Sequence, residues 1–303
     1  MNAKRRYRKH PKIRRALSRM TSPFRGRARH AVFAVSLVAM VVIVADVLWQ
    51  KFGTRILASS KYQISEATVV TTPPPSWIKS NVKAEVIRDG GLADLRIFDK
   101  QVVTRVANAF TVHPWVEKVV RVRKQPEKVV VELAYRQPVA FVEVTYGGSA
   151  GLVPVDPHGV LLPPSDFVTE DTQDYLRIAV VDLAMHGSLG TVWRDKRVAE
   201  AAQIASIWRS AWRKVDLYRV VCPQATKTTT YMLETRRGDR IIWGRPPGTE
   251  VVGEATAARK IAQLVRYVQQ DQAFQSASDP VQLDVRSGTV RTIPAKTASR
   301  VDD

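Results

Sequence analysis

The chain has 303 residues, of which 45% are hydrophobic and 25% are charged, and its formal net charge is +19. That length fits one or two compact domains. A single cysteine, Cys222, excludes an intramolecular disulfide, and the lack of a Cys or His cluster in the sequence argues against a structural zinc site. Stability must therefore come from the burial of apolar side chains.

The positive charge is concentrated at the N-terminus. Residues 1 to 30 hold twelve Lys and Arg residues and no Asp or Glu, whereas the rest of the chain has 35 basic and 28 acidic residues. An apolar run from Ala31 to Trp49 follows, with Asp46 as its one charged residue. A membrane-spanning helix needs about 20 mostly apolar residues. We therefore expect a basic cytoplasmic tail over residues 1–30 and a transmembrane helix over residues 31–50.

The basic flank predicts the orientation of this helix. Positive charges stay on the cytoplasmic side, so the protein should be single-pass type II, with its C-terminal part outside the cytoplasm. A cleaved signal peptide is the alternative, with residues 57 to 59 as a weak cleavage site, but the long basic leader fits an uncleaved anchor better. The tail could also bind nucleic acid, although attraction to lipid headgroups is the simpler role. The residues assigned to membrane insertion and topology are Arg25, Arg27, Arg29, Asp46 and Trp49.

A spacer and a small domain are expected next. Residues 51–78 form the spacer, made semi-rigid by three consecutive prolines, and the small domain covers residues 79–137. One helix on a three-stranded sheet is predicted there. The first element is a period-two strand at Val82–Val86. A helix capped by Asp99 follows, with an apolar stripe from Val102 to Phe110, and this helix ends before His113. Two strands complete the domain, at 116–122 and 128–136.

A larger, mainly β domain is expected over residues 138–292, with a disordered tail at 293–303. Apolar residues at helical spacing predict two helices, at 194–215 and 255–268. The whole chain is thus predicted to be α+β, with one N-terminal transmembrane helix, a small domain and a mainly β domain that carries two helices. The remaining apolar stretches predict strands at 139–145, 152–162, 174–183, 217–222, 229–235, 240–243 and 281–291.

We predict that the protein is not an enzyme. Gly147–Gly151, with Ser149 at its centre, matches a nucleophile-elbow pattern, but that mechanism needs a turn from strand into helix, and strand residues follow here. His113 and His158 are expected at the surface, and His186 has no neighbouring ligand pattern. Without metal-ligand spacing or a phosphate-binding glycine loop, no catalytic, cofactor or metal site and no small-molecule substrate is predicted.

Several motifs carry a family resemblance. In chain order they are His113–Val116, Tyr135–Ala140, Leu152–Leu162, Arg237–Arg245 and Leu283–Arg286. Behind a basic tail and one membrane run, this series resembles the bacterial division protein family FtsQ, also called DivIB, over residues 79 to 290. The resemblance implies a POTRA domain followed by the β domain of that family.

The same resemblance implies a function without a reaction. Such proteins are scaffolds of the divisome in the bacterial inner membrane, at the division septum, with their C-terminal domains in the periplasm. They recruit small coiled-coil membrane division proteins and couple septal peptidoglycan synthesis to cell division. Membrane lipid, these proteins and the septal synthesis machinery are the partners it implies, and no nucleic acid is expected.

Partner binding in that family involves the final strand. Here it corresponds to Val281, Gln282, Leu283, Asp284, Val285 and Arg286. An edge strand has unpaired N–H and C=O groups that a partner strand can bind. Two departures from the family pattern stand out: only seven residues separate Gly91 from Asp99, too few for the first of two POTRA helices, and the chain turns at Ser287–Gly288 directly after the strand.

A second hypothesis is a POTRA-bearing envelope chaperone or an energy-transducing transport component, because a fold does not fix a function. Such proteins are expected to have several POTRA repeats, a barrel or a long proline-rich spacer. The sequence shows one repeat and only three consecutive prolines, at residues 73 to 75. We therefore favour the division scaffold.

Overall fold

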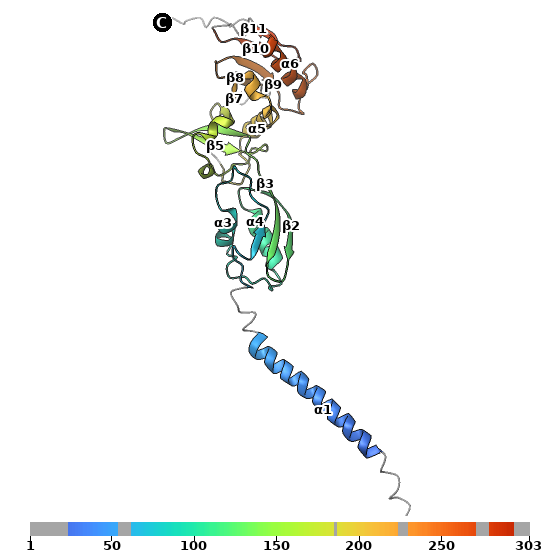
Figure 1. The fold of residues 1–303 in the computed structure, drawn as a ribbon. Helices are drawn as coiled ribbons and strands as arrows, with labels where there is room; N and C mark the ends of the chain where they lie inside the picture. The colour runs from blue at the N-terminus through green and yellow to red at the C-terminus, as the bar shows by residue number, and fades with distance from the viewer. Residues whose placement is uncertain (1–23, 54–61, 185–186, 224–229, 271–278, 294–303) are drawn as a thin grey trace, which may run out of the picture. The chain divides into compact units, whose positions relative to one another are not determined.

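The computed structural model describes residues 24–53, 62–184, 187–223, 230–270 and 279–293. It divides into two units, residues 1–62 and residues 63–303. In the first unit the helix α1 (Phe24–Leu48) runs into a π-helical turn, η1 (Trp49–Gly53) (Figure 1). The segment His30–Lys51 is long and apolar enough to cross a membrane. It coincides with the predicted transmembrane helix.

The residues assigned to membrane insertion lie at the two ends of α1. Arg25, Arg27 and Arg29 fall in its first turns, so the helix begins before the apolar run does. Asp46 has a neighbour that the sequence analysis did not identify, because Gln50 donates a hydrogen bond from Nε2 to its carboxylate at 2.9 Å. Trp49 opens the π-helical turn and is exposed. The weak cleavage site at residues 57 to 59 lies outside the described residues.

The second unit begins with a small sheet and two helices. The strands β1 (Val69–Thr71), β3 (Val129–Tyr135) and β2 (Val116–Lys124) lie side by side in that order, with β1 parallel and β2 antiparallel to β3. The helices α3 (Val82–Asp89) and α4 (Val102–Thr111) share one core with this sheet. The apolar stripe of α4, its end before His113 and the β2–β3 hairpin confirm the predictions for this region.

The predicted strand at Val82–Val86 is wrong, because these residues form α3. Val82 and Val86 are one helical turn apart and both are buried, a spacing that also satisfies a period of two. Asn81 caps the helix, and its side chain accepts a hydrogen bond from the Ala84 N–H at 3.1 Å. The small domain therefore has two helices, and the expected absence of the first one is corrected. Asp99 does not cap α4, since its carboxylate accepts the Arg96 N–H instead.

The expected spacer ends earlier than predicted. Ile64, Val69 and Ile78 are buried in the core of the small domain, and β1 supplies the third strand of its sheet. A strand as short as Val69–Thr71 has too few residues to show a period, which is why the sequence pattern did not reveal it. The second unit therefore begins near Gln63.

An eight-stranded sheet forms the larger domain. Its strands lie in the order β11-β10-β9-β8-β7-β6-β4-β5. The pairs β4–β6, β6–β7 and β9–β10 are parallel, and the other neighbouring pairs are antiparallel. The strands are β4 (Ala140–Tyr146), β5 (Ser149–Val155), β6 (Leu176–Val180), β7 (Leu217–Cys222), β8 (Tyr231–Thr235), β9 (Arg240–Gly244), β10 (Gln282–Asp284) and β11 (Arg291–Ile293).

Two crossover helices cover one face of this sheet. The helix α5 (Lys196–Trp208) connects β6 to β7, and α6 (Ala257–Gln270) connects β9 to β10. Both connections join parallel neighbours and advance toward β11, so right-handed crossovers place both helices on the same face. Trp208 of α5 and Trp243 of β9 meet there edge to face, with ring centroids 5.8 Å apart. Trp208 and Trp212, which both lie in the predicted helix at 194–215, therefore belong to the core.

Short one-turn helices fill the connections. They are η3 (Pro164–Asp166), η4 (Asp171–Asp174) and η5 (Trp212–Val215), the last of which completes the predicted helix that α5 begins. The predicted pair of strands at 152–162 is β5 followed by single bridges at Val160 and Leu161. The predicted strand at 281–291 is a hairpin of β10 and β11. Ala258 and Ala262, assigned to the apolar stripe of α6, are exposed.

A buried carboxylate joins the two domains of the second unit. Asp166 in η3 accepts hydrogen bonds from Trp115 Nε1 at 2.5 Å and from Ser80 Oγ at 2.9 Å, and it is only 3% exposed. Leu162, from the same segment, is buried in the core of the small domain. The segment between β5 and β6 therefore belongs to both cores and connects them through apolar contact and charge-assisted hydrogen bonds.

Replacing Asp166 with Ala should lower the free energy of unfolding by about 2–4 kcal/mol, because Trp115 and Ser80 would lose a charged acceptor in a buried place. Urea denaturation of the full chain in detergent, followed by tryptophan fluorescence, measures this. Asp94→Ala is the matched control, since Asp94 is exposed and such surface changes stay within about 0.5 kcal/mol. Equal stability of the two variants would show that the junction does not depend on Asp166.

Candidate functional site at the edge of the large sheet

The predicted partner-binding segment, residues 281 to 286, does not lie at the free edge of the sheet. β10 pairs with β9 on one side and with β11 on the other. Leu283 and Val285 are completely buried in the core of the larger domain. The sequence analysis treated residues 281 to 291 as one strand, and the turn at Ser287–Gly288 instead folds β11 back onto β10. β11 is the outermost strand at this end.

The start of β10 is fixed by a buried aspartate. Asp239, 2% exposed in the turn between β8 and β9, accepts hydrogen bonds from the Val281 N–H at 3.0 Å and from Thr235 Oγ1 at 2.8 Å. The Arg240 N–H then donates to the Val281 carbonyl at 2.9 Å. One carboxylate thus connects the β8–β9 turn to the strand that follows α6.

The end of β10 is held by a neighbouring ion pair. Arg286 donates to Asp284 through Nε and Nη2, with the shortest contact at 2.7 Å. Partial burial is the largest single influence and raises the pKa of Asp284, but the hydrogen bonds from Arg286 and the positive charges of Arg286 and Arg291 together outweigh it, so that its pKa lies below the ordinary value. The Arg286 carbonyl accepts the Ala255 N–H, which connects the end of the strand to the segment before α6.

The main chain of β11 has one residue directed outward. The main chains of Val281 and Val285 bond to β9. Main-chain groups alternate sides along a strand, so those of Leu283 also face β9. Those of Gln282 and Asp284 therefore face β11. The register pairs Leu283 with Thr292. Thr292 therefore forms a non-hydrogen-bonded pair with Leu283, and its N–H and C=O point to the free edge. A partner strand could bind there.

Two hollows flank the hairpin of β10 and β11. One, of about 330 Å³, lies between α6 and the hairpin turn and is lined by Arg266, Tyr267 and Val290, among others. The other, of about 420 Å³, lies beside the loop that precedes α6, where Val252 is fully exposed. Three arginines line this second hollow: Arg245, Arg286 and Arg291. The edge therefore offers basic and apolar side-chain contacts on both sides.

A buried lysine supports this region. Lys260 of α6 is completely buried, and its Nζ donates to Glu254 at 2.7 Å and to the Trp243 carbonyl at 3.0 Å. It also lies 4.5 Å from the centre of the Trp243 ring, within reach of a cation–π interaction. The burial of Lys260 could not be predicted from the sequence, because a lysine beside an apolar stripe is normally assigned to solvent.

The residues considered for catalysis do not come together. Ser149 begins β5 directly after the Gly147–Gly148 turn, so the segment is strand–turn–strand. His113 is not a surface residue as predicted: its side chain is only 9% exposed, and Nε2 lies 3.0 Å from Glu85 of α3. Burial raises the pKa of the Cys222 thiol. Within the described ranges, no group of three His, Cys, Asp or Glu side chains lies close enough together to hold a metal ion. His186 lies outside those ranges.

Comparisons with known proteins add no identification. No protein-family model matches the chain, and a search of curated proteins found no match.

Replacing Lys260 with Met should destabilise the protein by about 3 kcal/mol, because it leaves Glu254 buried without its cation. Guanidinium titration of the full chain in detergent measures the loss. Arg259→Met is the matched control, since the neighbouring Arg259 is exposed. The double variant Lys260→Met with Glu254→Gln should recover part of the loss, whereas no recovery would show that the ion pair is not the cause.

Stability should also depend on pH through Glu254. Burial raises the pKa of this carboxyl. Hydrogen bonds from Lys260 and the Arg245 N–H, together with the charge of Lys260, lower it by more, so that the pKa lies below its ordinary value of 4.5. A lowered folded-state pKa gives stability that is present above pH 4.5 and is lost as the pH falls through the folded-state value. The stability difference between wild type and Glu254→Gln should therefore shrink on acidification below pH 4.5. A constant difference would contradict this assignment.

Proposed function

We propose that the chain is a membrane-anchored scaffold of the bacterial divisome that binds its partners by strand addition at β11. The observation that carries this proposal is the outward-facing main chain of Thr292, on the last strand of an ectodomain that follows a membrane-spanning helix. The division class itself comes from the resemblance to the FtsQ and DivIB family. The two-helix, three-stranded small domain supports the POTRA part of that resemblance.

The proposed topology places the basic tail in the cytoplasm and the two folded domains in the periplasm. Support comes from the twelve basic residues before the apolar run and from their proximity to its start. In this orientation the ectodomain gathers small coiled-coil membrane division proteins at the septum and links them to peptidoglycan synthesis. No reaction and no cofactor form part of the proposal.

The chemistry of the β11 edge suggests what a partner segment contains. Main-chain bonding to Thr292 requires an extended segment. Three arginines line the adjoining hollow against two carboxylates, Asp284 and Glu254, and the remaining positive charge favours an acidic side chain near it. The exposed Val252 adds an apolar contact at the rim. An extended, acidic segment with one or two apolar residues therefore fits this edge.

Thr292→Pro is the sharpest test of strand addition, because proline removes an N–H that faces outward and leaves the β10–β11 ladder intact. Binding of the small coiled-coil partners to the full chain should weaken about tenfold, the equivalent of one or two main-chain hydrogen bonds. Co-purification from membranes measures binding, and midcell enrichment of a fluorescent fusion reports recruitment.

Thr292→Val is the matched control, since it changes the side chain but keeps the N–H. It should bind partners like wild type. Leu283→Pro and deletion of residues 281–303 are poor tests, because both damage a buried strand of the core. Unchanged partner binding by Thr292→Pro would rule out strand addition at β11, and uniform distribution in the envelope would count against the division role.

A further inference from the structure

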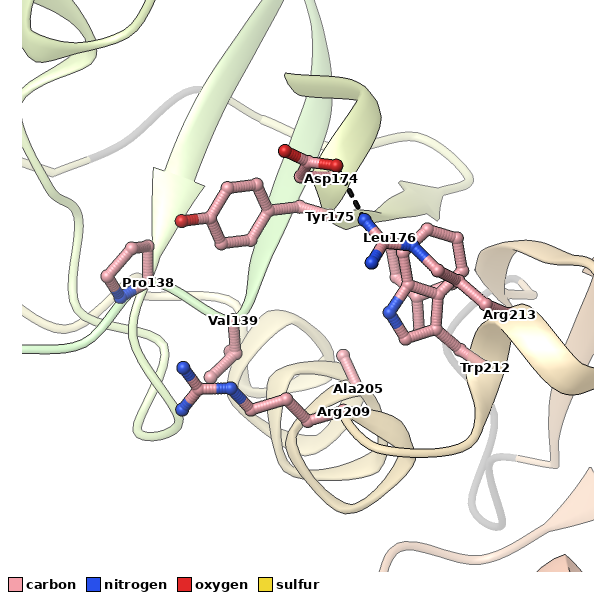
Figure 2. A pocket seen from close by; sticks show the side chains of 9 residues that line it. All are labelled: Pro138, Val139, Asp174, Tyr175, Leu176, Ala205, Arg209, Trp212 and Arg213. Carbon is pink, nitrogen blue, oxygen red and sulfur yellow. Dashed lines mark hydrogen bonds and ion pairs between the residues drawn. The ribbon is translucent and has the colours of Figure 1, made fainter. Parts of the chain in front are cut away.

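A third hollow lies far along the sheet from β11, where α5 ends beside the start of β4. Its volume is about 300 Å³. Figure 2 shows its lining: Tyr175 and Trp212 on either side, Arg209 and Ala205 from α5, and the ion pair of Asp174 with Arg213 above them. This place is bounded by β4, β6, α5 and η5, so its properties are independent of the β11 edge.

The floor of the hollow is formed by buried apolar side chains, whereas polar groups contribute most of its accessible lining. Val139, Leu176 and Ala205 line it and are at most 9% exposed. The Tyr175 ring is held edge to face against Phe141, with centroids 5.4 Å apart, and against Phe167 at 6.1 Å. Trp212 is 7% exposed. A pocket with fixed walls loses little freedom when a side chain enters it.

The rim carries an uncompensated positive charge. Arg213 donates to Asp174 at 2.5 Å and lies over the Trp212 ring at 4.9 Å, so its charge is already partnered. Arg209 forms no side-chain hydrogen bond or ion pair with any residue in the described ranges, and Figure 2 shows its side chain extending toward Val139 and Pro138. A free guanidinium at the mouth of a hollow with an apolar floor favours a carboxylate, which it can bind with two parallel hydrogen bonds.

Tyr175 adds a polar group at the same mouth. Burial raises the pKa of its hydroxyl, and the nearby Arg209 opposes that rise. The hydroxyl therefore stays protonated at neutral pH and is available as a hydrogen-bond donor. No hydrogen bond of this hydroxyl is found within the described part of the chain, so it can donate to the same carboxylate.

We propose that this hollow binds a segment of a partner protein in which a large apolar side chain stands next to a glutamate or aspartate. The apolar side chain lies between the Tyr175 and Trp212 rings, and the carboxylate bonds to Arg209. A volume of about 300 Å³ is at the lower end for ligand pockets, which fits one side chain and not a drug-sized ligand. The site is a second docking point on the ectodomain, independent of β11.

The test uses three capped dipeptides on the full chain in detergent micelles, titrated by ligand-observed NMR. Acetyl-Phe-Glu-amide carries both features, acetyl-Phe-Gln-amide lacks the charge, and acetyl-Gly-Glu-amide lacks the apolar side chain. The first should bind about tenfold more tightly than either of the others, because each lacks one of the two contacts. Equal binding of the first two would overturn the proposal.

Arg209→Gln provides the matched variant, because Arg209 is exposed and the fold does not depend on it. It should weaken acetyl-Phe-Glu-amide about tenfold and leave acetyl-Phe-Gln-amide unchanged. Arg105→Gln, an equally exposed change on α4, should alter neither. Loss of both peptides alike, or of neither, would contradict the pairing of Arg209 with a carboxylate.

Two further arms close the test. Free acetyl-Phe presents a chain-terminal carboxylate, and tighter binding of that acid than of acetyl-Phe-Glu-amide would overturn the choice of an internal acidic residue. The variant Thr292→Pro should bind acetyl-Phe-Glu-amide like wild type. Its failure to do so would show that the hollow and the β11 edge are not independent.

Discussion

Parallel neighbouring strands need a connection that passes over a face of the sheet, and this constraint shapes the larger domain. Two of its parallel pairs, β6–β7 and β9–β10, are joined by α5 and α6. Because right-handed crossovers place both helices on one face, the core forms there, around Trp208 and Trp243. The second crossover also delivers the chain to β10, and the final hairpin then places β11 at the outside.

Ionic contacts hold the places where this arrangement is least regular. Asp166 joins the two cores, Asp239 fixes the entry to β10, and Lys260 with Glu254 secures α6 to the end of β9. Each of these charges is buried and has several hydrogen-bond partners, which is the condition under which a buried charge is tolerated. They lie at connections between elements, where apolar contact alone leaves the geometry undetermined.

Long periodic elements could be predicted from the sequence, and short or ambiguous ones could not. α1, α4, α5 and the β2–β3 hairpin follow from spacing, because each has enough residues for one period to dominate. The stretch Val82–Val86 fits both a period of two and a helical turn, and the capping role of Asn81 was the signal that decides it. β1 and β11 have three residues each, and only pairing with distant strands defines them.

The candidate sites show the same division. Sequence reasoning predicted a binding strand at residues 281 to 286, whereas the register of β10 with its neighbours, which depends on contacts across the sheet, leaves Thr292 of β11 at the free edge. The contacts of Lys260 and the hollow beside Arg209 could not be predicted, because each brings together residues from separate elements. Burial of a lysine or a gap between helix and strand has no local pattern in the chain.

The shortness of β11 sets the character of assembly at this edge. Of the three residues of β11, Thr292 alone turns its main chain outward, so an added strand gains about 1–3 kcal/mol from backbone bonding there. Such an edge is too short to serve as a template for sheets that grow from copy to copy. Affinity must come from side chains in the flanking hollows, and side-chain contacts are what distinguish one partner from another. A complex built in this way dissociates readily, because its main-chain contribution is small.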